Sequence, residues 1–147
     1  IKIFKNEDCR FSYKNSVFEQ KGDLVILSVR LKLEKGDKKE IQKEINEHLS
    51  YRKRNQPLNF PSAGSIFKNP LPSGISEKFS AGELIEKCGL KRKRIGDAEI
   101  SEKHANFIVN LGGAKAKDVV ALMKLAKQEV KNKFGIALEE EIRIIHT

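Results

Sequence analysis

The segment of this sequence best suited to chemistry is a loop of small and polar residues around Ser65. Its small neighbours, Ala63 and Gly64, let the backbone and the serine hydroxyl approach a ligand closely. Lys68 and Asn69 follow and add a cation and an amide, two groups that bind phosphates and sugars. The loop matches neither a Walker phosphate-binding loop nor the glycine-flanked serine of hydrolases. By itself, the segment fits an ordinary turn as well as a ligand-binding loop.

A second candidate lies near the C-terminus, where three consecutive glutamates, Glu139, Glu140 and Glu141, stand in an apolar segment. In a strand, Glu139 and Glu141 would share one face and Glu140 would take the other. Charged residues also occur on edge strands, where they deter pairing with other chains. The residues themselves leave both interpretations open.

A third candidate is the polar run from Tyr13 to Ser16, which includes Lys14. It lies in residues 1–34, a part of the chain that we expect to be β-structure. Polar residues inside an apolar strand can mark a site, but an ordinary surface strand contains them as well. This candidate therefore stays open too.

Both helices and strands must position these candidate residues. Apolar residues that alternate with polar ones over residues 24–33 predict a strand. The sequence from Asp37 to Glu40 has the form of a capping box and predicts a helix that ends near residue 54. We expect that helix to bury an apolar stripe, which is formed by Ile41, Ile45 and Leu49.

The rest of the chain mixes short strands with helices. A long loop is expected over residues 55–79. A capping box at Ser80 then predicts a helix with Gly89 as its stop, and the longest apolar stripe predicts a helix over residues 116–134. Short strands are expected at 99–100 and 105–110, and a terminal strand at 136–145. This mixed order of helices and strands predicts an α+β fold, with a domain boundary near residue 36.

The composition excludes several classes of protein. Hydrophobic residues make up 39% and charged residues 33% of the 147 residues, which suits a folded domain with a highly charged surface. No run of about 18 apolar residues exists, so a membrane-spanning helix is not expected. Cys9 and Cys88 have no paired spacing and no secretion signal precedes them, which predicts free thiols and a cytoplasmic location. The three histidines are not spaced for metal ligation, so no metal is expected.

The net charge of +9 favours partners that bear phosphates, either a nucleic acid or a nucleotide substrate. Two basic clusters stand out, residues 52–54 and residues 91–94. Such runs commonly form solvated surfaces. Nucleic-acid-binding modules usually add exposed aromatic residues, and here only Tyr51 adjoins a cluster. A small basic nucleic-acid-binding module is therefore the alternative interpretation.

The chain begins at Ile1, and its only methionine is Met123. The first residues lack the apolar stretch that is typical of a signal peptide. We therefore expect this sequence to be part of a longer protein, and a function inferred from it to belong to the whole.

Taken together, these segments resemble the C-terminal part of the UDP-N-acetylenolpyruvoylglucosamine reductases, the MurB family of flavoenzymes. The matching stretches are residues 56–57, 61–70, 81–86, 89–91, 101–110 and 138–143. They occur in order over essentially the whole chain. The resemblance implies an α+β substrate-binding domain over residues 37–147. It also implies that residues 1–36 supply the last strands of an adjoining FAD-binding domain.

Members of that family reduce an enolpyruvyl ether on a UDP-amino sugar to the lactyl ether, with NADPH as donor and FAD as carrier. The resemblance therefore implies UDP-N-acetylglucosamine enolpyruvate as substrate, in peptidoglycan precursor synthesis. FAD would be bound mainly by the missing N-terminal half, since no segment of this chain resembles the family's glycine-rich flavin loops. The isolated chain is thus expected to bind little FAD and to be inactive. Neither a membrane nor a nucleic acid is implied as partner.

The resemblance assigns three residues to catalysis. Ser65 would donate the proton to the substrate's α-carbon, and Glu141 would stabilise the enolate intermediate or assist that transfer. Lys14 stands where the family has arginine. The resemblance further assigns four substrate-binding residues, Tyr13, Lys53, Lys68 and Asn69. Lys53 would reach the diphosphate.

The chain departs from the family pattern at three positions. Lys14 keeps the charge of arginine but loses its two-pronged hydrogen bonding, so the enolate or carboxylate would be held differently. This departure leaves open a non-catalytic relative. Arg92 and Asp97 stand where glycines are usual, and they predict a remodelled turn.

Overall fold

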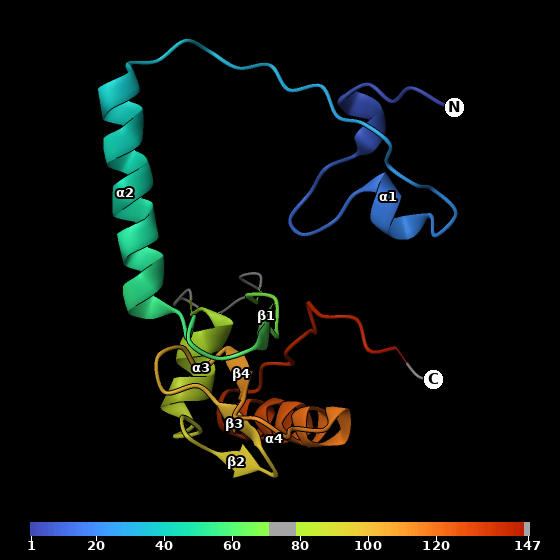
Figure 1. The fold of residues 1–147 in the computed structure, drawn as a ribbon. Helices are drawn as coiled ribbons and strands as arrows, with labels where there is room; N and C mark the ends of the chain where they lie inside the picture. The colour runs from blue at the N-terminus through green and yellow to red at the C-terminus, as the bar shows by residue number, and fades with distance from the viewer. Residues whose placement is uncertain (71–78, 146–147) are drawn as a thin grey trace. The chain divides into compact units, whose positions relative to one another are not determined.

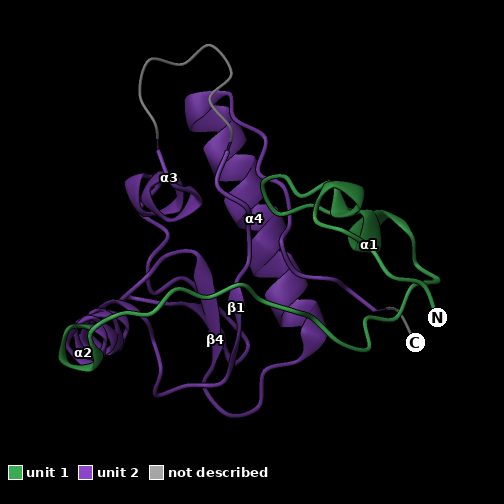
Figure 2. Cartoon of the chain, turned by 90° about the horizontal axis from the view of Figure 1, so that it is seen from above, with its two compact units in different colours: residues 1–40 green, residues 41–147 purple. Residues whose placement is uncertain are grey.

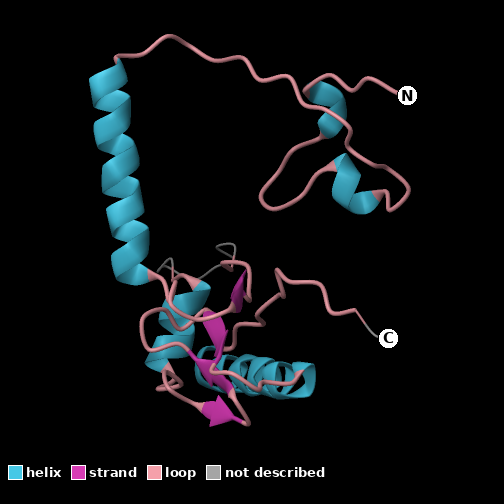
Figure 3. Cartoon of the chain, viewed as in Figure 1, coloured by secondary structure: helices cyan, strands magenta, loops and turns pink. Residues whose placement is uncertain are grey.

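The computed structural model describes residues 1–70 and 79–145 (Figure 1). Their contacts divide the chain into two compact units, residues 1–40 and residues 41–147 (Figure 2). Each unit is described by itself. Helices and a four-stranded antiparallel sheet, both within the described residues, confirm the predicted α+β class (Figure 3).

The first unit contains two short helical segments, η1 (Glu7–Cys9) and α1 (Val17–Gln20). Between them, Ser12 and Asn15 pair across a tight turn. The strand expected over residues 24–33 does not form in this structure, where these residues run as an irregular chain. A strand needs a neighbour for its backbone groups, and no described residue pairs with this segment. Its alternating apolar side chains are exposed, as the 82% of Val25 and 74% of Leu27 show.

Helix α2 (Lys38–Asn55) begins where the sequence predicts. The carboxylate of Asp37 accepts hydrogen bonds from the backbone N–H groups of Lys39 and Glu40, at 2.9 and 3.0 Å. The expected burial of its apolar stripe is wrong, because no residue of α2 is buried. Periodicity identifies which face of a helix is apolar, but only a neighbouring surface can bury it.

The second unit is built on a sheet with strand order β1-β4-β3-β2. Its strands are β1 (Ser62–Ser65), β2 (Arg94–Ile95), β3 (Ala98–Ile100) and β4 (Phe107–Asn110), and each pairs antiparallel with its neighbour. The two short strands expected at 99–100 and 105–110 are thus confirmed as β3 and β4. Strand β1 falls inside the expected loop over 55–79, of which residues 71–78 lie outside the described part of the chain.

Two helices cover this sheet, and both follow the sequence signals. Helix α3 (Ala81–Lys87) has the full predicted capping box: Ser80 and Glu83 each accept a backbone N–H of the other, at 3.2 and 2.7 Å. Helix α4 (Ala116–Phe134) ends at Gly135, whose φ of 70° is the left-handed conformation that glycine adopts without strain. Helix α4 packs against β2, β3 and α3. None of the described helices is both long enough and apolar enough to cross a membrane.

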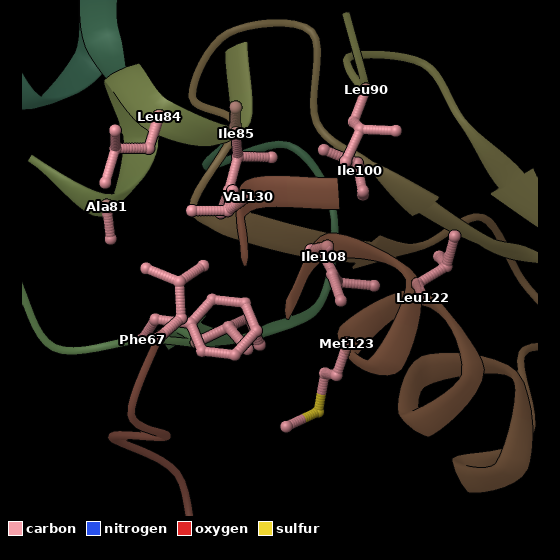
Figure 4. Packing of buried hydrophobic residues seen from close by; sticks show 14 of the residues in the cluster. Phe67, Ala81, Leu84, Ile85, Leu90, Ile100, Ile108, Leu122, Met123 and Val130 are labelled. Atoms are coloured by element: carbon pink, nitrogen blue, oxygen red, sulfur yellow. The ribbon is translucent and has the colours of Figure 1, made fainter. Parts of the chain in front are cut away.

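The core lies between α3, α4 and the sheet (Figure 4). Leu84 and Ile85 of α3 belong to one buried cluster with Leu122 and Val130 of α4, and all four side chains are at most 1% exposed. Phe67, the residue two places after the loop serine, is 2% exposed and belongs to the same cluster. The loop is therefore anchored in the core at its centre.

Arg92 and Asp97, which the sequence analysis expects to remodel a turn, both make polar contacts. Arg92 has a φ of 63°, a conformation that favours glycine, and its guanidinium pairs with Glu102. Asp97 pairs with Arg94 and accepts the backbone N–H of Gly113 at 3.0 Å. The remodelled turn itself stays a prediction.

The prediction of a terminal strand over residues 136–145 is wrong except at one residue. Within the described part of the chain, Glu140 alone of these residues pairs, opposite Phe67, as an isolated antiparallel bridge. The pairing of Phe67 with Glu140 does not extend further toward Pro70, because proline has no N–H group to donate to the opposite segment.

Candidate functional site

Ser65 is the last residue of β1 and lies at an irregularity in that strand. Ser62 pairs with Val109 and Ser65 with Phe107, so β1 has one more residue than β4 over the same stretch. The extra residue forms a bulge, and Gly64 within it has a φ of 82°. Bulges redirect the side chains that follow them. The half-buried hydroxyl of Ser65 thus takes its direction from the bulge rather than from regular strand alternation.

The residues after Ser65 are held on one side by Asn106. The carbonyl of Asn106 accepts the N–H of Ile66 at 2.9 Å. Its side-chain amide both accepts from the N–H of Phe67 at 3.0 Å and donates to the carbonyl of Phe67 at 2.8 Å. Three hydrogen bonds therefore join Asn106, the residue just before β4, to the two residues that follow the serine.

The same segment is held on its other side by the glutamate run. The N–H of Lys68 donates to the carbonyl of Glu139 at 2.9 Å, and the N–H of Glu141 donates to the carbonyl of Ile66 at 2.8 Å. Because Ile66 adjoins Ser65, this pairing places the backbone of half-buried Glu141 next to the serine. The structure thus brings the backbone of Glu141 next to the loop of Ser65 and Lys68, from which the sequence separates it widely.

The other two glutamates have different ion-pair partners. Glu139 pairs with the ammonium group of Lys68 at 2.5 Å, and its own side chain is 72% exposed. Glu140 pairs with Lys127 of α4 at 2.7 Å. The hydrogen bond from Lys127 lowers the pKa of the Glu140 carboxyl below its usual value. Glu140 therefore serves to attach this segment to α4.

Asn69 is exposed and lies at the start of α3. Its side-chain oxygen accepts the backbone N–H of Ala81 at 3.0 Å. This bond satisfies one of the donors that a helix leaves unpaired at its N-terminus. Asn69 therefore joins the serine loop to α3, whatever further contacts its amide makes.

The remaining predicted site residues lie elsewhere in the chain. Lys53 is exposed in the last turn of α2, and its carbonyl accepts the ammonium group of Lys103 at 3.2 Å. Tyr13 and Lys14 form the tight turn of the first unit, where Lys14 has a φ of 52°. Because the two units are described separately, the place of Tyr13 and Lys14 beside Ser65 stays a prediction.

Sequence reasoning gave no role to two residues that the structure places behind the loop. Asn106 is 4% exposed, and the ring nitrogen Nδ1 of His104 accepts its backbone N–H at 3.2 Å. The His104 ring also packs against Phe107, with ring centroids 5.0 Å apart. The available signal was an amide residue inside the apolar run of residues 105–109. A polar side chain there must find a partner when it is buried.

The pKa of His104 is lowered from the ordinary histidine value of 6.5, mainly by burial and then by the nearby charge of Lys91, while Glu86 acts in the opposite direction. Below about pH 6.5, unfolded chains bind a proton at this residue before folded chains do. The neutral ring therefore contributes stability above that pH, and this contribution is lost as the pH falls through the folded-state pKa.

We expect the urea midpoint of this chain to fall more between about pH 7.5 and about pH 5.5 than that of a His104→Gln variant. The exposed His48 provides the matched control, and His48→Gln should keep the wild-type slope. Equal slopes for wild type and His104→Gln would contradict the assignment.

Among the described residues, no group of three or more histidine, cysteine or acidic side chains could hold a metal ion. The amide of Asn106 is engaged with Phe67, and the oxygen of Asn69 with Ala81. Both side chains are thus engaged with main-chain groups of this chain. The arrangement offers a half-buried serine on a loop that also carries Lys68 and whose next residue pairs with the backbone of Glu141. A hydroxyl, a carboxyl group and an ammonium group suit proton transfer to a carbon next to a negatively charged oxygen.

Comparison with known proteins gives consistent results. Residues 56–145 match the sequence model of the C-terminal domain of UDP-N-acetylenolpyruvoylglucosamine reductase. The chain is 48% identical over 144 residues to the protein of that name from Fervidobacterium nodosum, covering 98% of this chain and 45% of that protein. It is 46% identical over 145 residues to the reductase from Bacillus subtilis, covering 99% of this chain and 46% of that protein. This chain thus spans less than half the length of the relatives it matches.

A solved structure supports the same match. The crystal structure of the UDP-N-acetylenolpyruvylglucosamine reductase MurB from Thermus caldophilus superposes with a TM-score of 0.61 at 45% identity. The alignment covers 78% of this chain and 38% of that protein. The fold and the sequence therefore point to one family.

Proposed function

Because this chain belongs to the UDP-N-acetylenolpyruvoylglucosamine reductase family, we propose that it is the substrate-binding part of a flavin-dependent oxidoreductase. The full-length protein converts UDP-N-acetylglucosamine enolpyruvate to UDP-N-acetylmuramate with NADPH, in peptidoglycan precursor synthesis. The observation that supports this most directly is the pairing that places Glu141 next to the loop serine, Ser65.

Each of these two residues has a distinct task. The reduction adds a hydride to the β-carbon of the enolpyruvyl double bond and a proton to the α-carbon. The hydroxyl of Ser65 donates that proton, and the carboxyl group of Glu141 assists the transfer or stabilises the enolate form. A hydroxyl is a weak acid, so it acts only where its surroundings favour the charged state that develops. The low dielectric constant of a closed site strengthens such effects.

Five further residues bind or orient the substrate. Lys68 and Asn69 lie on the serine loop and contact the UDP-sugar, while Lys53 contacts the diphosphate. Tyr13 and Lys14 come from the first unit, and Lys14 replaces the family's arginine at the enolate or carboxylate. The ion pair between Lys68 and Glu139 leaves the Lys68 ammonium group partly accessible, since its side chain is 28% exposed. An anionic substrate can therefore compete with Glu139 for it.

The flavin is bound mainly by a part of the full-length protein outside this chain, and NADPH supplies the hydride through it. Two observations support such a partner. No described residue buries the apolar side chains in residues 24–33. The apolar stripe of α2 is likewise not buried by described residues, and its Ile45 is 45% exposed. We assign residues 1–36 to the adjoining FAD-binding domain and residues 37–147 to the substrate-binding domain. The free thiols of Cys9 and Cys88 agree with a reducing, cytoplasmic location.

The nucleic-acid alternative has weaker support. Three residues of the second basic cluster are paired with acidic side chains: Lys91 with Glu86, Arg92 with Glu102 and Arg94 with Asp97. Such pairing lowers the net positive charge that the cluster presents to a phosphate backbone.

The test uses the full-length protein with FAD bound. NADPH oxidation should depend on UDP-N-acetylglucosamine enolpyruvate and yield UDP-N-acetylmuramate, and this chain without the rest should show no turnover. Binding to duplex DNA should be weak at about 150 mM salt. No substrate-dependent oxidation, together with tight and salt-dependent DNA binding, would favour the alternative.

A further inference from the structure

Asn106 is a buried amide that lies between β4 and the loop that carries Ser65. The residue is 4% exposed, and its side chain makes two hydrogen bonds to the main chain of Phe67. We propose that Asn106 is a positioning residue: its amide fixes the peptide groups of Phe67 and thereby the direction of the Ser65 hydroxyl. This inference rests on the proposed function, in which Ser65 donates a proton.

The side-chain amide of Asn106 makes the two hydrogen bonds that a backbone residue of a longer β4 would make. Strand β4 begins at Phe107, and immediately before it the chain turns, since the N–H of Phe107 donates to the carbonyl of His104 at 3.0 Å. Beyond Ile66, β4 therefore has no regular ladder residue to offer to Phe67. A side-chain amide presents one acceptor and one donor side by side, as a backbone residue does. The Asn106 side chain thus extends the sheet by one residue.

This extension matters because the strand is irregular on the other side of Ser65. Gly64 has a φ of 82°, and no described residue lies within 4 Å of where its Cβ would be, so the described part of the chain does not pack the bulge from that direction. The position of Ser65 therefore depends on its own pairing with Phe107 and on the contacts of Ile66 and Phe67. A displacement of about 1 Å in an active site can lower the rate about 100-fold.

Asn106→Asp in the full-length protein gives a specific test. As a carboxylate, the new side chain accepts the N–H of Phe67 but places a second acceptor against its carbonyl. As a neutral acid it can donate to that carbonyl, which restores both bonds. We expect kcat to fall about 100-fold at neutral pH. As the pH falls, the ratio of the variant's kcat to that of wild type should then rise by up to about tenfold per pH unit, until the buried carboxyl group is protonated.

The matched control is Asn110→Asp. The side-chain oxygen of Asn110 accepts the N–H groups of Gly112 and Ala114, at 2.8 and 3.0 Å. A carboxylate can accept both, so this variant should keep the wild-type rate and pH profile. Asn106→Ala removes the amide without adding a charge, and it should lower kcat without recovery at low pH.

Hydrogen exchange of a peptide that covers residues 65–69, measured on the same full-length variants, does not depend on turnover. Exchange corrected for pH should be faster in Asn106→Asp at neutral pH, approach wild type at low pH, and stay unchanged in Asn110→Asp. Unchanged exchange in Asn106→Asp, full activity of Asn106→Ala, or a pH-independent loss in Asn106→Asp would overturn the proposal. If wild type does not reduce the UDP-sugar, the proposed function fails, while the exchange data still decide whether Asn106 holds the loop.

Discussion

Ser65→Ala in the full-length protein is expected to lower kcat for reduction of the UDP-sugar by about 10²- to 10⁴-fold, the usual contribution of a positioned proton donor. Alanine fits the half-buried position at the end of β1 and leaves the backbone pairing with Phe107 unchanged. Substrate affinity should therefore change little. Steady-state NADPH oxidation and binding calorimetry, measured on the same preparation, separate the two effects.

The control for this experiment is Ser62→Ala in the same strand. Ser62 is exposed, and its hydroxyl accepts a long hydrogen bond of 3.4 Å from the N–H of Gly64. We expect its kcat within about twofold of wild type, in line with the small effects of most surface substitutions. Wild-type turnover in Ser65→Ala would remove Ser65 from the mechanism and favour a non-catalytic relative.

Glu141→Gln is expected to lower kcat by about 10²- to 10³-fold, as the loss of a preorganised charged or hydrogen-bonding group at a developing enolate does. Glutamine keeps the shape of the side chain. It also keeps the backbone bond from residue 141 to the carbonyl of Ile66, so the serine loop should stay in place. Reduction rates over a range of pH, with a thermal unfolding control, measure the effect.

Glu140→Gln is the matched control for that variant. It removes a charge from the next residue, whose partner is Lys127 of α4. An exposed ion pair contributes about 0.2–1 kcal/mol, so Glu140→Gln should lose a little stability and no activity. Equal losses of kcat in Glu140→Gln and Glu141→Gln would indicate a general charge effect instead of a role for Glu141.

The double variant of Ser65→Ala and Glu141→Gln decides whether the two residues act together. Residues that serve one proton transfer are strongly non-additive, so the double variant should be about as slow as the slower single variant. If the losses multiply, Ser65 and Glu141 contribute to separate steps.

Local sequence signals predicted the elements that depend on local physics. The capping box of Ser80 and the left-handed glycine after α4 satisfy backbone groups within a few residues of themselves. Such interactions need no distant partner, and the helices begin and end where the sequence predicts. The same reasoning failed for residues 24–33, for the face of α2 and for most of the terminal segment. In each case the sequence identifies an apolar pattern but not the surface that would bury or pair it.

The sequence by itself determined the family and the α+β class, because motifs and short-range periodicity are properties of contiguous stretches; its assignment of the site residues stays a prediction. Only the tertiary structure decided how the site is assembled. The bulge at Gly64, the pairing of Ile66 with Glu141 and the amide of Asn106 on Phe67 join segments far apart in the chain. Which backbone groups meet across such distances depends on strand register and on the packing of α3 and α4, and no local pattern specifies either.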